Sequence, residues 1–265
     1  MPMPISAIDT LEGKGFVSNP LRHTHLFLKG RGRDAMTPDD MAVLEDSVAD
    51  VIALPARKIV IRREERVRYS SLLLEGVMCR YMDDRHGNRQ IVAFHVPGDF
   101  VDLHGFAMRY LDHDVATLTP VRVATVGHDR LEAIVQHRPR LTRLLWFSTL
   151  LDAAMHREWV FRLGRLEADG RVAHLFCELH ERLAMVDMVR DGAFRFPVTQ
   201  IDLAEAAGIT PVHLNRVLRS LRERGLMTFR SGDVHILDSD ALRTLADFDP
   251  GYLFGGGPTM NEKIA

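Results

Sequence analysis

A short stretch near the C-terminus carries the side chains best suited to bind another molecule. It contains His213, Asn215, Arg216 and Arg219 on one predicted helix. Arginine can bond guanine N7 and O6 as a fork, asparagine can do the same for adenine, and both side chains also reach phosphates. On a helical wheel these residues share one side of the helix with Val212. The residue types and their placement favour contact with DNA.

The residues around this helix predict a helix-turn-helix. Thr199 is a good N-cap for a first helix, because its hydroxyl can accept an amide proton of the first turn. Gly208 falls where that helix must stop, since glycine tolerates the left-handed conformation of such a stop. Thr210 can cap the second helix, and Pro211 suits its first position. These offsets are those of the motif.

The other side of the second helix is apolar. It carries Leu214, Val217, Leu218 and Leu221 at the i, i+3, i+4, i+7 spacing of a buried face. An ordinary amphipathic helix, whose arginines only face water, would show the same stripe. The caps, the glycine and the proline favour DNA binding over that alternative.

A predicted hairpin over residues 226–237 follows directly and would form a wing, with Arg230 and Ser231 at its tip, where they could touch phosphate. The predicted DNA-binding set comprises Thr199, Gln200, Thr210, Pro211, Val212, His213, Asn215, Arg216, Arg219, Arg230 and Ser231. The expected partner of this set is double-stranded DNA.

Bulk properties narrow the class of protein. The 265 residues are enough for two domains, and the net charge of −2 excludes a uniformly basic, histone-like protein. Cys79 and Cys177 lie far apart without metal-ligand spacing and are too few for a four-cysteine iron–sulfur cluster. We find no signal sequence and no apolar run long enough for a bilayer, so we expect a cytoplasmic protein without a membrane partner.

The N-terminal half predicts a β-barrel or jelly roll. After an irregular extension, Thr37 caps a predicted helix that continues through residues 41–51. Many short strands separated by turn signals then follow, as in barrels. The predicted strands are Lys58–Arg62, Ser71–Glu75, Val77–Met82, Gln90–His95, Val115–Leu118 and Val121–Val126.

A long helix is predicted over Leu141–Leu166, about 26 residues and roughly 39 Å. It is longer than a small barrel needs as cover, which favours packing against a second copy of the chain, in a homodimer. An ordinary core helix of a monomer is the alternative. The predicted dimer interface comprises Leu144, Phe147, Leu151, Ala154, Met155 and Phe161.

These patterns divide the chain into an N-terminal extension (1–36), a barrel (37–138), the long helix (139–168), a DNA-binding domain (169–250) and a flexible tail (251–265). In this order, the segments resemble the Crp/Fnr family of bacterial transcription regulators. The resemblance is carried by Pro97–Phe100, by the long helix and, most specifically, by Leu203–Leu221. It implies an α+β fold with a jelly-roll barrel, a dimerisation helix and a winged helix-turn-helix.

The resemblance also implies a function. Members of the family are homodimers that bind inverted-repeat promoter sites, so RNA polymerase is a candidate partner. Arg216 occupies the family's common base-contacting arginine position. Many relatives have a base-reading glutamate where this chain has Val212, so we expect His213 and Asn215 to act as substitutes.

Family members that bind a cyclic nucleotide have Gly-Glu after the Gly-Asp-Phe turn, and an Arg-Ser/Thr pair that holds the phosphate. Here these positions hold Asp102-Leu103 and Leu111-Asp112, and carboxylates would repel a phosphate by roughly 1 to several kcal/mol. Arg109 lies two residues away and could reach in. The predicted effector pocket comprises Gly98, Asp99, Asp102, Leu103, His104, Arg109 and Asp112; the effector itself stays open, and no cofactor is required.

The barrel histidines leave two alternatives. His95, His104 and His113 could sense a metal or haem, or serve a cupin-like metalloenzyme, but the expected His-x-His element is absent. A third interpretation is an adaptor that uses the winged domain for protein contacts. We find no nucleophile triad and no phosphate-cradling glycine loop, so the sequence does not predict an enzyme.

Overall fold

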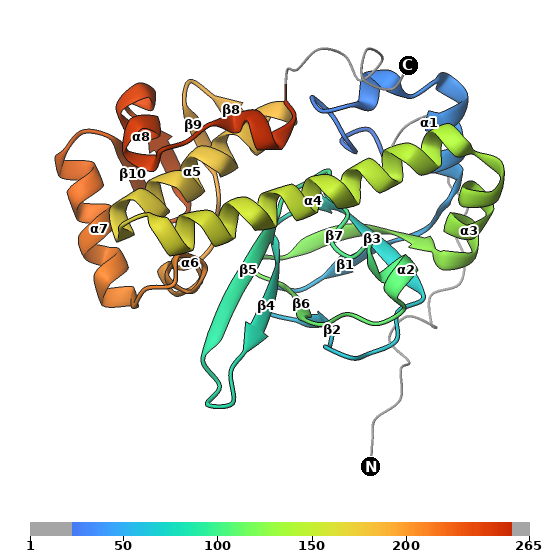
Figure 1. Cartoon of the computed structure of the whole chain (residues 1–265), viewed down its shortest axis with the longest axis horizontal. Helices are drawn as coiled ribbons and strands as arrows, with labels where there is room; N and C mark the ends of the chain where they lie inside the picture. Colours follow the sequence, from blue (N-terminus) through green and yellow to red (C-terminus); the bar gives the residue numbers. More distant parts are fainter. Residues whose placement is uncertain (1–22, 256–265) are drawn as a thin grey trace.

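Two antiparallel sheets form the N-terminal domain of the computed structural model, which describes residues 23–255 (Figure 1). One sheet has the strand order β1-β7-β3, and the other has the order β2-β6-β4-β5. The strands are β1 (Val48–Leu54), β2 (Ile59–Ile61), β3 (Tyr69–Glu75), β4 (Met78–Asp83), β5 (Arg89–His95), β6 (Asp114–Thr117) and β7 (Val121–Gly127). The predicted α+β class and barrel domain are confirmed.

The first strand departs from the prediction. Helix α1 (Pro38–Asp46) begins at the predicted Thr37 cap, whose hydroxyl accepts from the Asp40 amide. It ends at Asp46, however, and residues 48–54 form β1, which pairs with β7. The helix predicted through residue 51 was therefore too long. The β-branched residues Val48, Val51 and Ile52 suit a strand as well as a helix end, so the pattern alone was ambiguous.

Helix α4 (Pro139–Arg165) runs along the whole molecule and links its two domains (Figure 1). Its first half packs into the barrel core through Leu141 and Leu144, beside α3 (His128–His137). Its second half packs into the C-terminal core through Met155 and Trp159. The predicted long helix is confirmed.

The C-terminal domain contains a four-stranded sheet with the order β10-β11-β9-β8 and four helices among the described residues. Its elements are α5 (Ala168–Met185), β8 (Val189–Arg190), β9 (Ala193–Arg195), α6 (Gln200–Ala207), α7 (Pro211–Glu223), β10 (Met227–Arg230), β11 (Asp233–Ile236) and α8 (Ser239–Ala246). The predicted helix-turn-helix and wing hairpin are present. The sequence did not predict β8, β9, α8 or the short helix α2 (Gly105–Met108).

Both ends of the described chain pack against the fold. In the N-terminal segment, Phe27 and Leu28 are buried in the barrel core, ahead of the 3₁₀ helix η1 (Arg33–Ala35). At the other end, η2 (Pro250–Leu253) lies on α4, and the Tyr252 hydroxyl donates to Glu178 at 2.9 Å. The prediction of a flexible tail is therefore wrong for residues 251–255.

Residues 256–265 of the predicted tail lie outside the described residues. The same holds for residues 1–22 of the predicted N-terminal extension. Within residues 23–255, we find no helix with the length and apolar character needed to cross a membrane.

Candidate nucleic-acid interface

The helix-turn-helix is built from local capping contacts. The Thr199 hydroxyl accepts from the Asp202 amide at 3.2 Å, and the Asp202 carboxylate accepts from the Thr199 amide at 2.8 Å. Gly208 ends α6 with a φ of 63°, the left-handed conformation that favours glycine. The Thr210 hydroxyl then accepts from the His213 amide at 3.2 Å and caps α7, with Pro211 at its first position. These local predictions are confirmed.

One face of α7 is buried and the other faces solvent. Leu214, Val217 and Leu221 are buried in the C-terminal core, with Ala204 and the rest of the α6 apolar face. The predicted binding residues on the opposite face are exposed: Pro211, Val212, His213, Asn215, Arg216 and Arg219. Because the buried face fixes the helix, the exposed face is presented as one rigid surface.

A hollow of about 140 Å³ lies between this face and the wing. It is lined by Gln200, Asn215, Leu218, Arg219, Arg222, Thr228, Phe229 and Arg230. The Asn215 side-chain amide donates to Gln200 at 3.2 Å, which connects α7 to the first residue of α6. Arg230 and Ser231 lie at the wing turn, where Ser231 has a φ of 52°.

Arg222 is a further candidate contact that was not predicted from the sequence. It follows Arg219 by three residues and therefore lies on the same side of the helix, which was the signal that could have identified it.

The arginines of this surface are available to a ligand. In the described part of the chain, none of Arg216, Arg219, Arg222 and Arg230 forms an ion pair with a carboxylate, whereas Arg195 pairs with Asp233 at 2.7 Å. Free guanidinium donors on an exposed rigid helix can bond base edges or phosphates without first breaking an internal contact.

The fold and this surface define a DNA-binding regulator with a winged helix-turn-helix. Residues 170–245 match the family model described as the Crp-like helix-turn-helix domain. Residues 51–138 match the model described as the cyclic nucleotide-binding domain. The chain belongs to the Crp/Fnr family of transcription regulators, as the sequence resemblance implied.

Curated relatives agree with this assignment, and a solved structure shares the fold. The chain is 28% identical over 175 residues to the nitrogen fixation regulation protein FixK of Bradyrhizobium diazoefficiens, covering 66% of this chain and 72% of FixK. It is 25% identical over 214 residues to the transcriptional activator protein FnrL of Cereibacter sphaeroides, covering 79% of this chain and 84% of FnrL. The FixK2 structure from Bradyrhizobium japonicum shares the fold with a TM-score of 0.69 at 23% identity, covering 75% of this chain and 97% of that one.

The predicted effector-pocket residues do not share one pocket. Gly98 and Asp99 lie in the turn after β5, where the Asp99 carboxylate accepts from the Val96 amide at 2.9 Å and from Arg182 at 2.6 Å. Asp102 is fully buried and accepts from the Ser71 amide at 2.6 Å; burial raises the pKa of its carboxyl to about 7.

The other members lie elsewhere. Leu103 packs into the barrel core, and Asp112 accepts a hydrogen bond from His113 Nδ1 at 2.7 Å. Arg109 lines a separate hollow of about 320 Å³ together with Arg66, Val67, Arg68, Tyr69, His128 and Asp129. Among the predicted effector residues, Arg109 therefore lines one hollow, whereas Gly98 and Asp99 line another.

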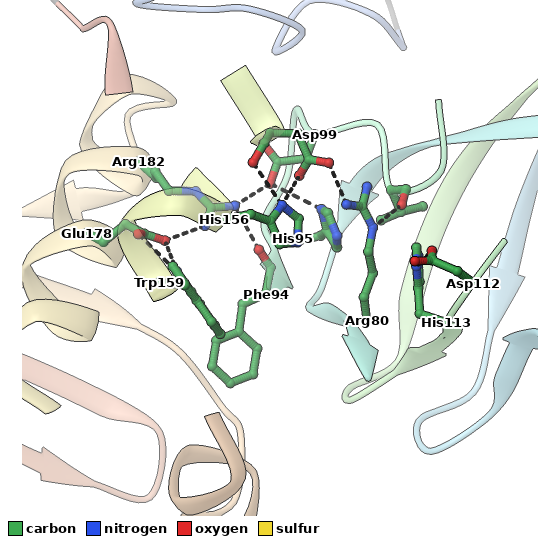
Figure 2. Close-up of polar contacts among 12 residues, drawn as sticks. Arg80, Phe94, His95, Asp99, Asp112, His113, His156, Trp159, Glu178 and Arg182 are labelled. Carbon is green, nitrogen blue, oxygen red and sulfur yellow. Dashed lines mark hydrogen bonds and ion pairs between the residues drawn. The ribbon is translucent and has the colours of Figure 1, made fainter. Parts of the chain in front are cut away.

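The region between the barrel and α4 is filled with buried charged and polar groups (Figure 2). Arg80 is almost fully buried; it donates to the Val101 carbonyl at 2.8 Å and forms an ion pair with Asp152 of α4. Arg182 of α5 lies between Glu178 and Asp99 and bonds both. Each of these two arginines is therefore paired with a carboxylate of the same chain.

The barrel histidines do not converge on a metal geometry. His95 is buried without a hydrogen-bond partner for either ring nitrogen, and burial holds its pKa well below its usual range. The rings of His104, the residue before α2, and His113 have their centroids 5.3 Å apart. Residues 23–255 hold no group of three or more histidine, cysteine or acidic side chains placed to hold a metal ion. The metal-sensing alternative therefore lacks geometric support.

Most of the predicted dimer interface is buried within this chain. Leu144, Leu151, Ala154 and Met155 face the chain's own barrel and C-terminal core. Phe147 is half-buried and contacts Phe254, with ring centroids 5.7 Å apart. Of the predicted set, Phe161 is exposed.

The exposed apolar residues of α4 form a different stripe. They are Trp146, Leu150, Val160 and Phe161, with exposed fractions of 65%, 53%, 72% and 41%. We call this stripe the free α4 face; it shares only Phe161 with the predicted dimer interface.

Proposed function

We propose that this protein is a homodimeric transcription regulator that binds an inverted-repeat site in double-stranded DNA through α7. The observation that carries the proposal is the exposed face of α7, whose arginines make no ion pair within residues 23–255. Such a site would be at promoters in the bacterial cytoplasm, where RNA polymerase is the expected partner.

The free α4 face supports the dimer. Trp146, Leu150 and Val160, with Ala153 and Arg157 between them, follow the alternating spacing of three and four residues that a partner helix requires. Two copies related by a two-fold axis would place their α7 helices in successive major grooves, about one helical turn of DNA apart.

Arg216 is the proposed base-reading residue, with His213 and Asn215 as further readers. Arg216 is exposed at the middle of α7, and Val212, one turn earlier, offers only an apolar contact. A bidentate arginine–guanine contact contributes about 1–3 kcal/mol of discrimination against the wrong base.

Control by a cyclic nucleotide through the family's usual phosphate contacts is not part of this proposal. Leu111 is buried, and Asp112 is exposed and bonded to His113 at the positions where the phosphate-holding pair would lie. The nearby Arg80 guanidinium is already paired with Asp152. An anionic phosphate there would meet a carboxylate instead of a free cation.

Binding to duplex DNA of selected sequence, measured by fluorescence anisotropy at several salt concentrations, tests the proposal. Arg216→Ala should weaken specific binding by about 1–3 kcal/mol and relax one base position. The matched control is Arg122→Ala, because Arg122 is bound to Glu75 on the barrel surface. Equal affinities of the wild type and Arg216→Ala, or the absence of a preferred sequence, would contradict the proposal.

A further inference from the structure

Two arginines of the barrel bind the first helix of the DNA-binding domain. Arg57, from the turn between β1 and β2, donates to the two carboxylate oxygens of Asp202 at 2.6 and 2.8 Å. Arg89, at the start of β5, donates to Asp202 at 3.0 Å and to Glu205 at 2.6 Å. We call these four residues the α6 clamp.

Asp202 is the central residue of the α6 clamp. Its side chain is fully buried, and it is also the residue that closes the capping box with Thr199. The same carboxylate therefore completes the start of α6 and receives both barrel arginines. Removing one partner of a buried carboxylate is costly because the remaining charge is left without compensation.

The opposite end of α6 is also held from outside the helix-turn-helix. Arg162 of α4 is fully buried, with its guanidinium 3.9 Å from the centre of the Trp159 ring, and it donates to the Ala206 carbonyl at 3.2 Å. Carbonyls at the end of a helix lack partners within the helix and carry partial negative charge, so a cation suits this position. The barrel and α4 thus hold the two ends of α6.

The position of α6 determines the position of α7. The two helices share the C-terminal core, where Ala204 and Ala207 of α6 are fully buried with Leu214 of α7. Only the short turn through Gly208 separates them. Figure 1 shows α6 between the β4–β5 hairpin and α7, so a contact on α6 can orient α7 from the side away from DNA.

We propose that Arg57 and Arg89 are positioning residues for DNA binding: through Asp202 and Glu205 they hold α7 in the orientation that recognises its site. The inference rests on the proposed function, since it assumes that α7 binds DNA. Neither arginine belongs to the exposed face of α7, so their effect is transmitted through α6.

Charge reversal and charge exchange in the full-length protein test the α6 clamp. The variants are Arg89→Glu, Glu205→Arg and the double variant with both changes; Asp202 is kept because the helix cap depends on it. The matched control is Arg122→Glu, which breaks the Arg122–Glu75 ion pair within the barrel. Circular dichroism verifies that each variant is folded, and Arg89→Gln provides a milder change if Arg89→Glu does not fold.

Each single variant should bind the selected DNA site about tenfold more weakly, and the double variant should recover most of that loss. The dependence of affinity on salt should keep its slope, because the number of phosphate contacts is unchanged. Unchanged or tighter binding, no recovery in the double variant, or a loss as large in Arg122→Glu would overturn the proposal. A slope lowered by about 1 would also overturn it, since Arg89 would then touch a phosphate itself.

Amide hydrogen exchange in the free protein separates this proposal from the proposed function. Arg89→Glu should speed exchange in α6 and the double variant should restore it, whether or not DNA binds. If the wild type binds no DNA but the variants change exchange in α6 as expected, the proposed function is contradicted. The α6 clamp would then be a contact between the domains that does not position α7 for DNA binding. Unchanged exchange in Arg89→Glu would end the clamp itself.

Discussion

The exposed face of α7 and the region between the barrel and α4 both contain many charged groups, but these groups have different partners in the two regions. Among the described residues, the α7 arginines make no ion pair with the protein, whereas Arg80 and Arg182 are buried and bound to carboxylates. A DNA phosphate can therefore bind the α7 arginines without displacing another group. An anion that approached the region between the barrel and α4 would have to break existing ion pairs. Free donors, and not the number of charges, distinguish a binding surface from a structural network.

The largest expected effect comes from breaking the structural network. Arg182→Ala removes the cation between the fully buried Glu178 and the half-buried Asp99, and leaves the Glu178 carboxylate without its ion-pair partner. We expect the free energy of unfolding to fall by about 3–5 kcal/mol, measured by urea denaturation. Arg219→Ala on the α7 face should change it by no more than about 0.5 kcal/mol. Equal losses of stability in both variants would remove the difference between the two regions.

The neighbouring residues Leu150 and Leu151 separate the free α4 face from the buried one. Leu150→Asp places a charge on the exposed stripe, so the dimer should weaken by at least about 2 kcal/mol while the subunit stays folded. Leu151→Asp places a charge in the core and should reduce the stability of the fold itself. Light scattering and urea denaturation measure the two effects. A fully dimeric Leu150→Asp variant would show that the interface lies elsewhere.

The smallest effect in this set is a loss of stability between pH 7 and pH 5. Burial and the nearby Arg80 lower the pKa of His104 from 6.5 to about 3. Below pH 6.5, His104 therefore binds a proton in the unfolded chain but stays neutral in the folded chain. The free energy of unfolding consequently falls as the pH drops from 6.5 toward 3. The loss should approach about 1.4 kcal/mol per pH unit for this histidine.

Urea denaturation at pH 7 and pH 5 measures this loss. His104→Gln should show a smaller fall in stability between the two values, and the control His86→Gln, on the exposed β4–β5 turn, should show the full fall. The same fall in both variants would mean that His104 does not contribute to the acid sensitivity of the barrel.

Local signals made the helix-turn-helix predictable from the sequence, whereas the α6 clamp could not be predicted from it. The caps at Thr199 and Thr210 and the stop at Gly208 lie within a few residues of the structure that they specify. In contrast, Arg57 and Asp202 are 145 positions apart, and Arg89 and Asp202 are 113 apart. No local pattern indicates which distant arginine meets which carboxylate.

The long helix shows a different limit. The sequence correctly predicted that α4 is one long helix, but two apolar stripes, one through Leu151 and one through Leu150, have similar spacing. Deciding which stripe packs on the chain itself requires knowing where the barrel lies. The predicted effector residues show the same limit, because they lie in the segment between β5 and β6, whose path in space no local pattern specifies.

Selection of bound fragments from a random pool of duplex DNA tests the central claim most directly. Wild-type protein should enrich an inverted repeat whose half-sites lie about one helical turn apart. Arg216→Ala should lose preference at one base position, symmetrically in both half-sites. Enrichment of a single unrepeated site, or of no sequence at all, would contradict a dimer that reads DNA through two α7 helices.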